Sequence, residues 1–287
     1  MYLSFFGLHE NPFSLAPDPR FLLMAASHQE VFPQLLAQRG VVVLTGEPGT
    51  GKTALLLALR ERLAADTAVS YVFNTTLAFH DIVEYLLDDL GIAKPEESPA
   101  RRLDTLTSFL SERERAGQRT TLIVDEAQHL DVSTLAQLAL LSSHDRETPS
   151  RLLQILLVGP PELETKLEHP DLQHLQAPPR CRLRPLDGEE VEQYLRHRLQ
   201  VAGAPDTALF DRSAIDRIAQ FSGGIPRVIN ILGDRCLLFA YADHDHHVDR
   251  GTARRAIADL DDTASAPRKV FRATWAGLVR RLRARRG

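Results

Sequence analysis

The stretch GEPGTGKT, at residues 46–53, combines glycines with a lysine and a threonine, between the apolar run VVVL and the helical pattern ALLLALRERL. Its spacing fits G-x-x-x-x-G-K-[ST], a loop that binds phosphate between a strand and a helix. Glycines let backbone N–H groups face a phosphate at the helix N-terminus. We therefore expect nucleotide phosphates to be bound by Gly46, Glu47, Pro48, Gly49, Thr50, Gly51, Lys52 and Thr53.

A second stretch, TTLIVDEAQHL at residues 120–130, is expected to deliver two carboxylates to the end of a buried strand. Asp125 can hold Mg²⁺ together with the Thr53 hydroxyl, and Glu126 can polarise an attacking water. Lys52 would bridge the β- and γ-phosphates. A strand ending in Asp-Glu is weak evidence alone, because acidic residues also cap helices. Combined with the phosphate loop, it predicts a site for ATP and Mg²⁺.

The elements that must position these residues alternate along the chain. Strands are expected at 41–45, 69–73, 120–124, 152–158 and 180–186, and helices at 52–65, 78–90, 101–116 and 131–144. Apolar strands alternating with helices indicate a parallel α/β sheet that is covered on both faces. Only helical patterns follow Asp187. We therefore expect a nucleotide-binding core at 1–186, a small all-α module at 187–262, and a linker with a basic tail at 263–287.

Charge is unevenly distributed in this 287-residue chain, whose net charge is −4. Residues 264–287 hold eight basic residues and no acidic one. Phe271, Trp275, Leu278 and Leu282 would share one helical face among these arginines, a pattern that suits an anionic membrane surface or an acidic partner, although a solvated tail is the alternative. There is no secretory signal and no apolar run long enough to cross a membrane, so a cytoplasmic location is expected, with association at the inner membrane face as an option.

The order of the motifs resembles the AAA+ ATPases, and within them the ExeA-type ATPases of the general secretion pathway. The resemblance runs from Met1 to about Asp262 and includes MYLSFFGLHENPFSLAPDPRFL, LTGEPGTGKT, VDEAQHL, VGPPEL and GGIPRVINILGDRCLLFAYA. It implies an AAA+ core followed by a helical lid, ATP-dependent assembly into a homo-oligomeric ring, and an envelope-assembly protein as partner. By the same resemblance, Arg227 is the lid arginine that reaches the γ-phosphate. Base-pocket candidates are Asn11, Pro12 and Phe13, for which core packing is the alternative.

Two departures from this family concern hydrolysis. Pro160 stands where relatives carry a polar residue that orients the attacking water, and proline has neither a side-chain donor nor a backbone N–H. Gln128 or His129 could compensate. Between residues 172 and 186, the arginine that relatives extend to a neighbouring subunit is displaced or absent, and Arg180 is the nearest substitute, with Arg182 second.

Three functions remain open from the sequence. The leading one is a slowly hydrolysing AAA+ ATPase that serves a secretion channel, a pilus or a polysaccharide exporter. A DNA-binding regulator of the transposition type is the second, although the acidic body of the chain argues against direct binding to duplex DNA. The third is a scaffold that binds ATP and hardly turns it over.

Overall fold

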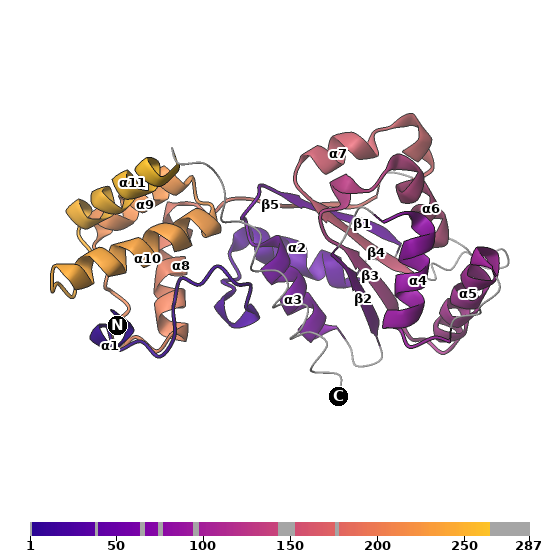
Figure 1. The fold of residues 1–287 in the computed structure, drawn as a ribbon, viewed down its shortest axis with the longest axis horizontal. Helices are drawn as coiled ribbons and strands as arrows, with labels where there is room; N and C mark the ends of the chain where they lie inside the picture. The colour runs from indigo at the N-terminus through magenta and orange to yellow at the C-terminus, as the bar shows by residue number, and fades with distance from the viewer. Residues whose placement is uncertain are drawn as a thin grey trace. The chain divides into compact units, whose positions relative to one another are not determined.

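The structure, a computed structural model, divides into two compact units, Met24–Arg184 and Met1–Leu23 joined with Pro185–Gly287. These units are described separately below (Figure 1). The described residues are 2–37, 40–63, 67–73, 77–93, 98–142, 153–175 and 178–264.

The unit Met24–Arg184 is built on a five-stranded parallel sheet with the order β2-β3-β4-β1-β5. Its strands are β1 (Val41–Gly46), β2 (Ala68–Val72), β3 (Thr120–Val124), β4 (Gln154–Gly159) and β5 (Arg180–Leu183). Every residue of β1, β3 and β4 is buried, as their uninterrupted apolar runs predict. The parallel α/β fold that the sequence predicts is therefore confirmed.

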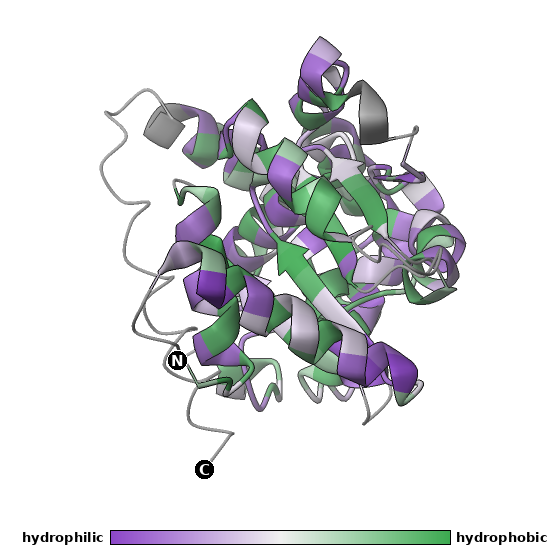
Figure 2. Ribbon diagram, turned by 90° about the vertical axis from the view of Figure 1, so that its right-hand side faces the viewer, coloured by the Kyte–Doolittle hydropathy of each residue, from purple (hydrophilic) through white to green (hydrophobic). Residues whose placement is uncertain are grey.

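Helices cover both sides of this sheet, with α2 and α3 on one side and α4, α5 and α6 on the other (Figure 1). Their bounds are α2 (Ala26–Ala37), α3 (Lys52–Arg62), α4 (Phe79–Asp89), α5 (Pro99–Arg115), α6 (Val132–Ser142) and α7 (Glu162–Leu167), with short 3₁₀ helices η2 (Ala127–His129) and η3 (Pro170–Leu175). Hydrophobic residues concentrate in the strands (Figure 2). Fully buried side chains such as Leu86, Leu106 and Leu122 join the sheet to α4 and α5.

Strand order brings three carboxyl ends to one edge of the sheet. Thr45 of β1 lies beside Gly159 of β4, and Leu157 of β4 lies beside Val124 of β3. The end of β4 is therefore between the phosphate loop, which follows β1, and the acidic pair, which follows β3. Ligands of doubly wound sheets bind at this edge.

The second unit is helical. It contains α8 (Gly188–Val201), α9 (Arg212–Ser222), α10 (Pro226–Ala242) and α11 (Arg250–Ala264), together with α1 (Tyr2–Phe5) and the 3₁₀ helix η1 (Pro19–Phe21). The chain enters α10 through Gly224, whose φ is +75° and whose absent Cβ would lie 1.9 Å from the carbonyl oxygen of Leu186. Only glycine fits this close approach.

The N-terminal segment belongs to this helical unit, whereas the sequence had assigned it to the core. The reason is Arg198 of α8, which is only 6% exposed and donates hydrogen bonds to the carbonyl oxygens of Pro12 and Ser14. Its guanidinium also lies 4.5 Å from the ring centroid of Phe21. These contacts join residues about 180 positions apart, and no periodic pattern in the sequence indicates them.

None of the described helices is long and apolar enough to span a membrane. The basic amphipathic tail predicted from the sequence lies, apart from its linker residues, outside the described ranges.

Candidate nucleotide-binding site

The phosphate loop follows β1 and begins at Gly46. A Cβ at Gly46 would lie 2.8 Å from the carbonyl oxygen of Leu183 and 2.9 Å from the Thr50 hydroxyl, so the strand end has no room for a side chain. Gly49 and Gly51 have φ values of 90° and 98°, which favour glycine. Thr50 closes the turn, because its hydroxyl donates to the carbonyl oxygen of Glu47 at 2.8 Å. The loop therefore has the backbone conformation that its glycines predict.

Lys52 begins α3 and is only 8% exposed. Its Nζ donates to the carbonyl oxygens of Gly46 at 2.7 Å and Glu47 at 3.2 Å, which holds the ammonium over the loop. Burial lowers the pKa of Lys52, while the nearby carboxylates of Glu126 and Asp125 oppose this shift. A cation held at this point is positioned to bind phosphate oxygens.

Asp125 and Thr53 meet between the two motifs. The Thr53 hydroxyl donates to Asp125 Oδ2 at 3.2 Å, and the hydroxyl of Tyr71, in β2, donates to the same oxygen at 2.9 Å. Burial strongly raises the pKa of the Tyr71 phenol, which keeps it a neutral donor. The sequence does not single out Tyr71, because an aromatic residue in a buried strand is ordinary core composition.

Glu126 has left-handed backbone angles, with φ 55° and ψ 38°. A non-glycine residue in this region costs about 1–3 kcal/mol and occurs preferentially at functional sites. Its amide donates to Asp125 Oδ1 at 3.0 Å, and its carbonyl accepts from His129 at 3.1 Å. The turn therefore exposes the Glu126 side chain while Asp125, 3% exposed, stays buried.

These residues fit Mg·ATP. The loop offers backbone N–H groups at the N-terminus of α3 and a lysine for phosphate oxygens. Thr53 and Asp125 offer adjacent oxygen ligands, which Mg²⁺ prefers. The structure thus brings the predicted residues of the loop together with Asp125 and Glu126 in one unit.

The burial of Asp125 predicts a stability effect. Burial raises the pKa of Asp125, so the folded protein ionises this carboxyl at higher pH than the unfolded chain, in which the pKa is about 4. The cost of ionisation therefore grows as pH rises through this window and persists at neutral pH. Asp125→Asn should therefore raise the Tm of the nucleotide-free protein at pH 7.

Asp131→Asn is the matched control in the same thermal unfolding scans. Hydrogen bonds from Thr134 and Ser133 lower the pKa of Asp131, so its carboxylate stabilises the fold at neutral pH, and its replacement should lower Tm. A lower Tm for Asp125→Asn at pH 7 would contradict the assigned cost of burying this charge.

The end of β4 lacks a polar side chain where one would orient water. Gly159 is followed by Pro160 and Pro161, and the Pro160 carbonyl accepts from the amide of Leu163 at the start of α7. Gln128, in η2, approaches this strand end, since a Cβ at Gly159 would lie 2.7 Å from Gln128 Oε1.

Arg180 and Arg182 lie on β5, an outer strand of the sheet, and both are exposed. Arg180 Nη1 is 3.8 Å from a Glu164 carboxylate oxygen and 3.7 Å from one of Glu168. Its side chain is 41% exposed, and an ion pair in this setting contributes only about 0–1 kcal/mol. These contacts therefore do not prevent Arg180 from reaching another partner.

The remaining predicted residues lie in the helical unit. Phe13 is 2% exposed, and its ring lies 2.9 Å from where a Cβ of Gly233 would be. The Asn11 amide group donates to Asp234 at 3.1 Å and its oxygen accepts from the Phe13 amide, while the Pro12 carbonyl accepts from Arg198. These three residues therefore have structural roles within the unit.

Arg227 lies in the first turn of α10, directly after Pro226, and is exposed. A proline at this position suits the start of a helix.

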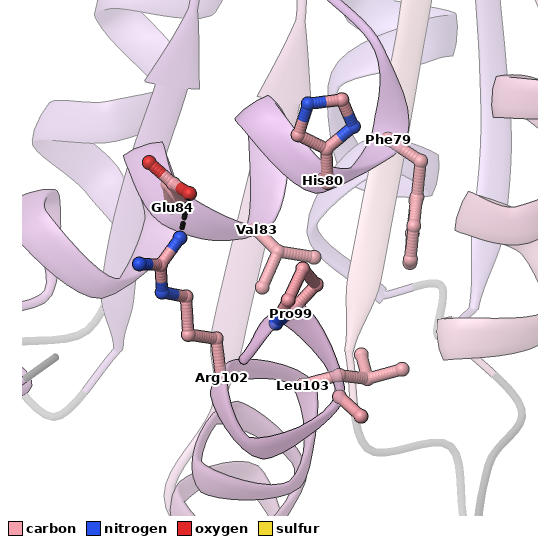
Figure 3. Close-up of a pocket in the computed structure, with 8 residues that line it drawn as sticks. Phe79, His80, Val83, Glu84, Pro99, Arg102 and Leu103 are labelled. Carbon is pink, nitrogen blue, oxygen red and sulfur yellow. Dashed lines mark hydrogen bonds and ion pairs between the residues drawn. The ribbon is translucent and has the colours of Figure 1, made fainter. Parts of the chain in front are cut away.

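A pocket of 220 Å³ lies apart from the phosphate loop, between α4 and α5 (Figure 3). Its walls are mainly apolar, with Val83 and Leu103 among them, and the ion pair between Glu84 and Arg102 lies at one side. Among the described residues, no group of three or more histidine, cysteine or acidic side chains could hold a metal ion there or elsewhere.

Comparison with known proteins gives one family and one close relative in sequence. Residues 36–167 match the AAA domain family. Over 267 residues, the chain is 37% identical to general secretion pathway protein A from Aeromonas hydrophila, a match that covers 91% of this chain and 48% of that protein. The chain thus spans about half the length of this relative.

Solved structures agree on the fold. Cdc6p from Pyrobaculum aerophilum has a TM-score of 0.65 at 19% identity, covering 86% of this chain and 70% of that one. The ORC2 protein from Aeropyrum pernix has a TM-score of 0.64 at 16% identity, covering 87% and 71%. The chain therefore has the AAA+ fold, its residues 36–167 match the AAA domain family, and it is similar in sequence to general secretion pathway protein A.

Proposed function

We propose that the chain binds Mg·ATP at residues 46–53 and hydrolyses it slowly, with Glu126 activating the attacking water. The convergence of Lys52, Thr53 and Asp125 at the ends of β1 and β3 supports this proposal most directly. Lys52 would hold the β- and γ-phosphates, while Thr53 and Asp125 would hold Mg²⁺. Bound Mg²⁺ would neutralise charge that develops on the phosphates. Glu126, exposed beside this pair, would take the proton of the water.

We expect slow turnover because the residue that would orient the attacking water is replaced. Pro160 offers no donor to the attacking water. We assign to Arg180 the role of the arginine that reaches the γ-phosphate of a neighbouring subunit. We assign to Arg227 the role of the lid arginine that senses the γ-phosphate. We expect kcat below the common range of about 1–10³ s⁻¹. Asn11, Pro12 and Phe13 would influence adenine binding only through the packing of the helical unit.

For the cellular role, we propose an ATP-dependent homo-oligomeric ring that acts with a protein partner in an envelope machine for secretion, pilus assembly or polysaccharide export. Similarity to a protein named for the general secretion pathway supports this context. The basic tail, with eight positive residues, would bring the chain to the cytoplasmic face of an anionic membrane.

Phosphate release by the intact chain at saturating Mg·ATP tests this proposal, with and without anionic vesicles and duplex DNA. We expect a slow rate of phosphate release per subunit. This rate per subunit should rise with protein concentration, because oligomers assemble, and should not respond to DNA. Stimulation by DNA would favour the transposition-type regulator instead. Stable ATP-bound oligomers without phosphate release would favour the scaffold, and failure to bind ATP would end all three proposals.

A further inference from the structure

Gln128 contacts the carboxylate that would activate water. Its Nε2 donates a hydrogen bond to Glu126 Oε2 at 2.7 Å. Within the part of the chain that the structure describes, this is the only hydrogen bond recorded for that carboxylate. Hydrogen bonds to a charged acceptor are short and about twice as strong as neutral ones. Gln128 is therefore placed to fix the direction of the Glu126 side chain.

The other end of the same amide is wedged against the end of β4. Gln128 Oε1 is buried and has no hydrogen-bond partner among the described residues. It lies where a side chain at Gly159 would be, 2.7 Å from the expected Cβ. The reverse orientation of the amide would set its oxygen against the carboxylate, so the assigned orientation is the favourable one. The contact therefore depends on the glycine at position 159.

The backbone that carries Gln128 is held as well. Lys166 Nζ, from α7, donates to the carbonyl oxygen of Gln128 at 2.8 Å and to that of Leu130. Since α7 begins immediately after Pro160 and Pro161, the same segment that lacks a water-orienting side chain anchors η2. Gln128 is thus fixed at its backbone carbonyl and by the hydrogen bond from Nε2, and Oε1 packs against Gly159, so the side chain is preorganised, as a positioning group must be.

We propose that Gln128 is the positioning residue for Glu126, and that it supplies from η2 the fixed amide that Pro160 cannot supply from β4. This inference rests on the proposed role of Glu126 in hydrolysis. Gln128 acts through the Glu126 carboxylate and contributes nothing to nucleotide affinity.

Two substitutions are each expected to disrupt the hydrogen bond between Gln128 and Glu126. Gln128→Ala removes the donor, and Gly159→Ala puts a methyl carbon 2.7 Å from Oε1, too close for the Gln128 amide to keep its place. Each should lower kcat about 10–100-fold, the usual range for one well-placed hydrogen bond to a charged group, and leave the Kd for Mg·ATP within twofold of wild type. Because both remove the same contact, the double variant should be no slower than the slower single variant.

Gly188→Ala is the matched glycine control, since a Cβ there meets nothing within 4 Å, and it should retain wild-type kcat. Thermal unfolding checks that each variant is folded. Unchanged kcat in Gln128→Ala, or losses that multiply in the double variant, would overturn the inference. Glu126→Gln, measured in the same assay, distinguishes failure of the proposed function from failure of the role of Gln128. If it hydrolyses like wild type, the proposed function fails. If it alone loses activity, only the role of Gln128 fails.

Discussion

Lys52→Ala is expected to weaken Mg·ATP binding by about 10–100-fold, because it removes charge-assisted hydrogen bonds to the β- and γ-phosphates. In the structure, the Lys52 ammonium donates hydrogen bonds to the carbonyl oxygens of Gly46 and Glu47 in the loop. Calorimetric titration should show a larger loss for ATP than for ADP, since ADP lacks the γ-phosphate.

Arg62→Ala is the control for this measurement. Arg62 lies in the last turn of the same helix, α3, and is exposed, so its replacement also removes one positive charge. Its Kd for Mg·ATP should match wild type. Equal Kd values for Lys52→Ala and wild type would remove the phosphate-loop assignment.

Arg180→Ala is expected to lower kcat by about 10³-fold without a change in ATP affinity, because an arginine that stabilises the transition state from a neighbouring subunit contributes 10³–10⁵ in rate. Arg182→Ala is the matched control, two residues along the same strand and also exposed. Steady-state phosphate release and calorimetry separate the effects on kcat and on binding.

A mixing experiment tests whether Arg180 acts between subunits. Lys52→Ala lacks a working nucleotide site but keeps Arg180, whereas Arg180→Ala keeps its site. Mixed rings should therefore regain activity that neither variant has alone. No recovery would argue against action in trans, and a large loss in Arg182→Ala with none in Arg180→Ala would mean that the residues between 172 and 186 were aligned wrongly with the family.

The sheet and the phosphate site could be predicted because local signals determine them. Buried parallel strands read as apolar runs, and their order along the chain alternates with helices. The loop glycines carry their own conformational requirement, seen at Gly49 and Gly51. Asp125 and Glu126 follow from the position of a strand end.

Contacts between distant elements could not be predicted. The N-terminal segment joins the helical unit through Arg198, whose pattern in α8 is that of any helical arginine. Tyr71 reaches Asp125 from a neighbouring strand, and periodicity does not reveal a hydrogen bond of this kind. The sequence offers both Gln128 and His129 as candidates to compensate for Pro160, and the hydrogen bond from Gln128 Nε2 to Glu126 favours Gln128.

The most direct test of the central claim is the rate of ATP hydrolysis by Glu126→Gln relative to wild type, at saturating Mg·ATP. This substitution keeps the size of the side chain and removes the base, so kcat should fall about 10²–10⁴-fold while Kd for Mg·ATP stays unchanged. Hydrolysis by Glu126→Gln at the wild-type rate, with ATP bound equally well, would contradict the assignment of this site as the one that activates water.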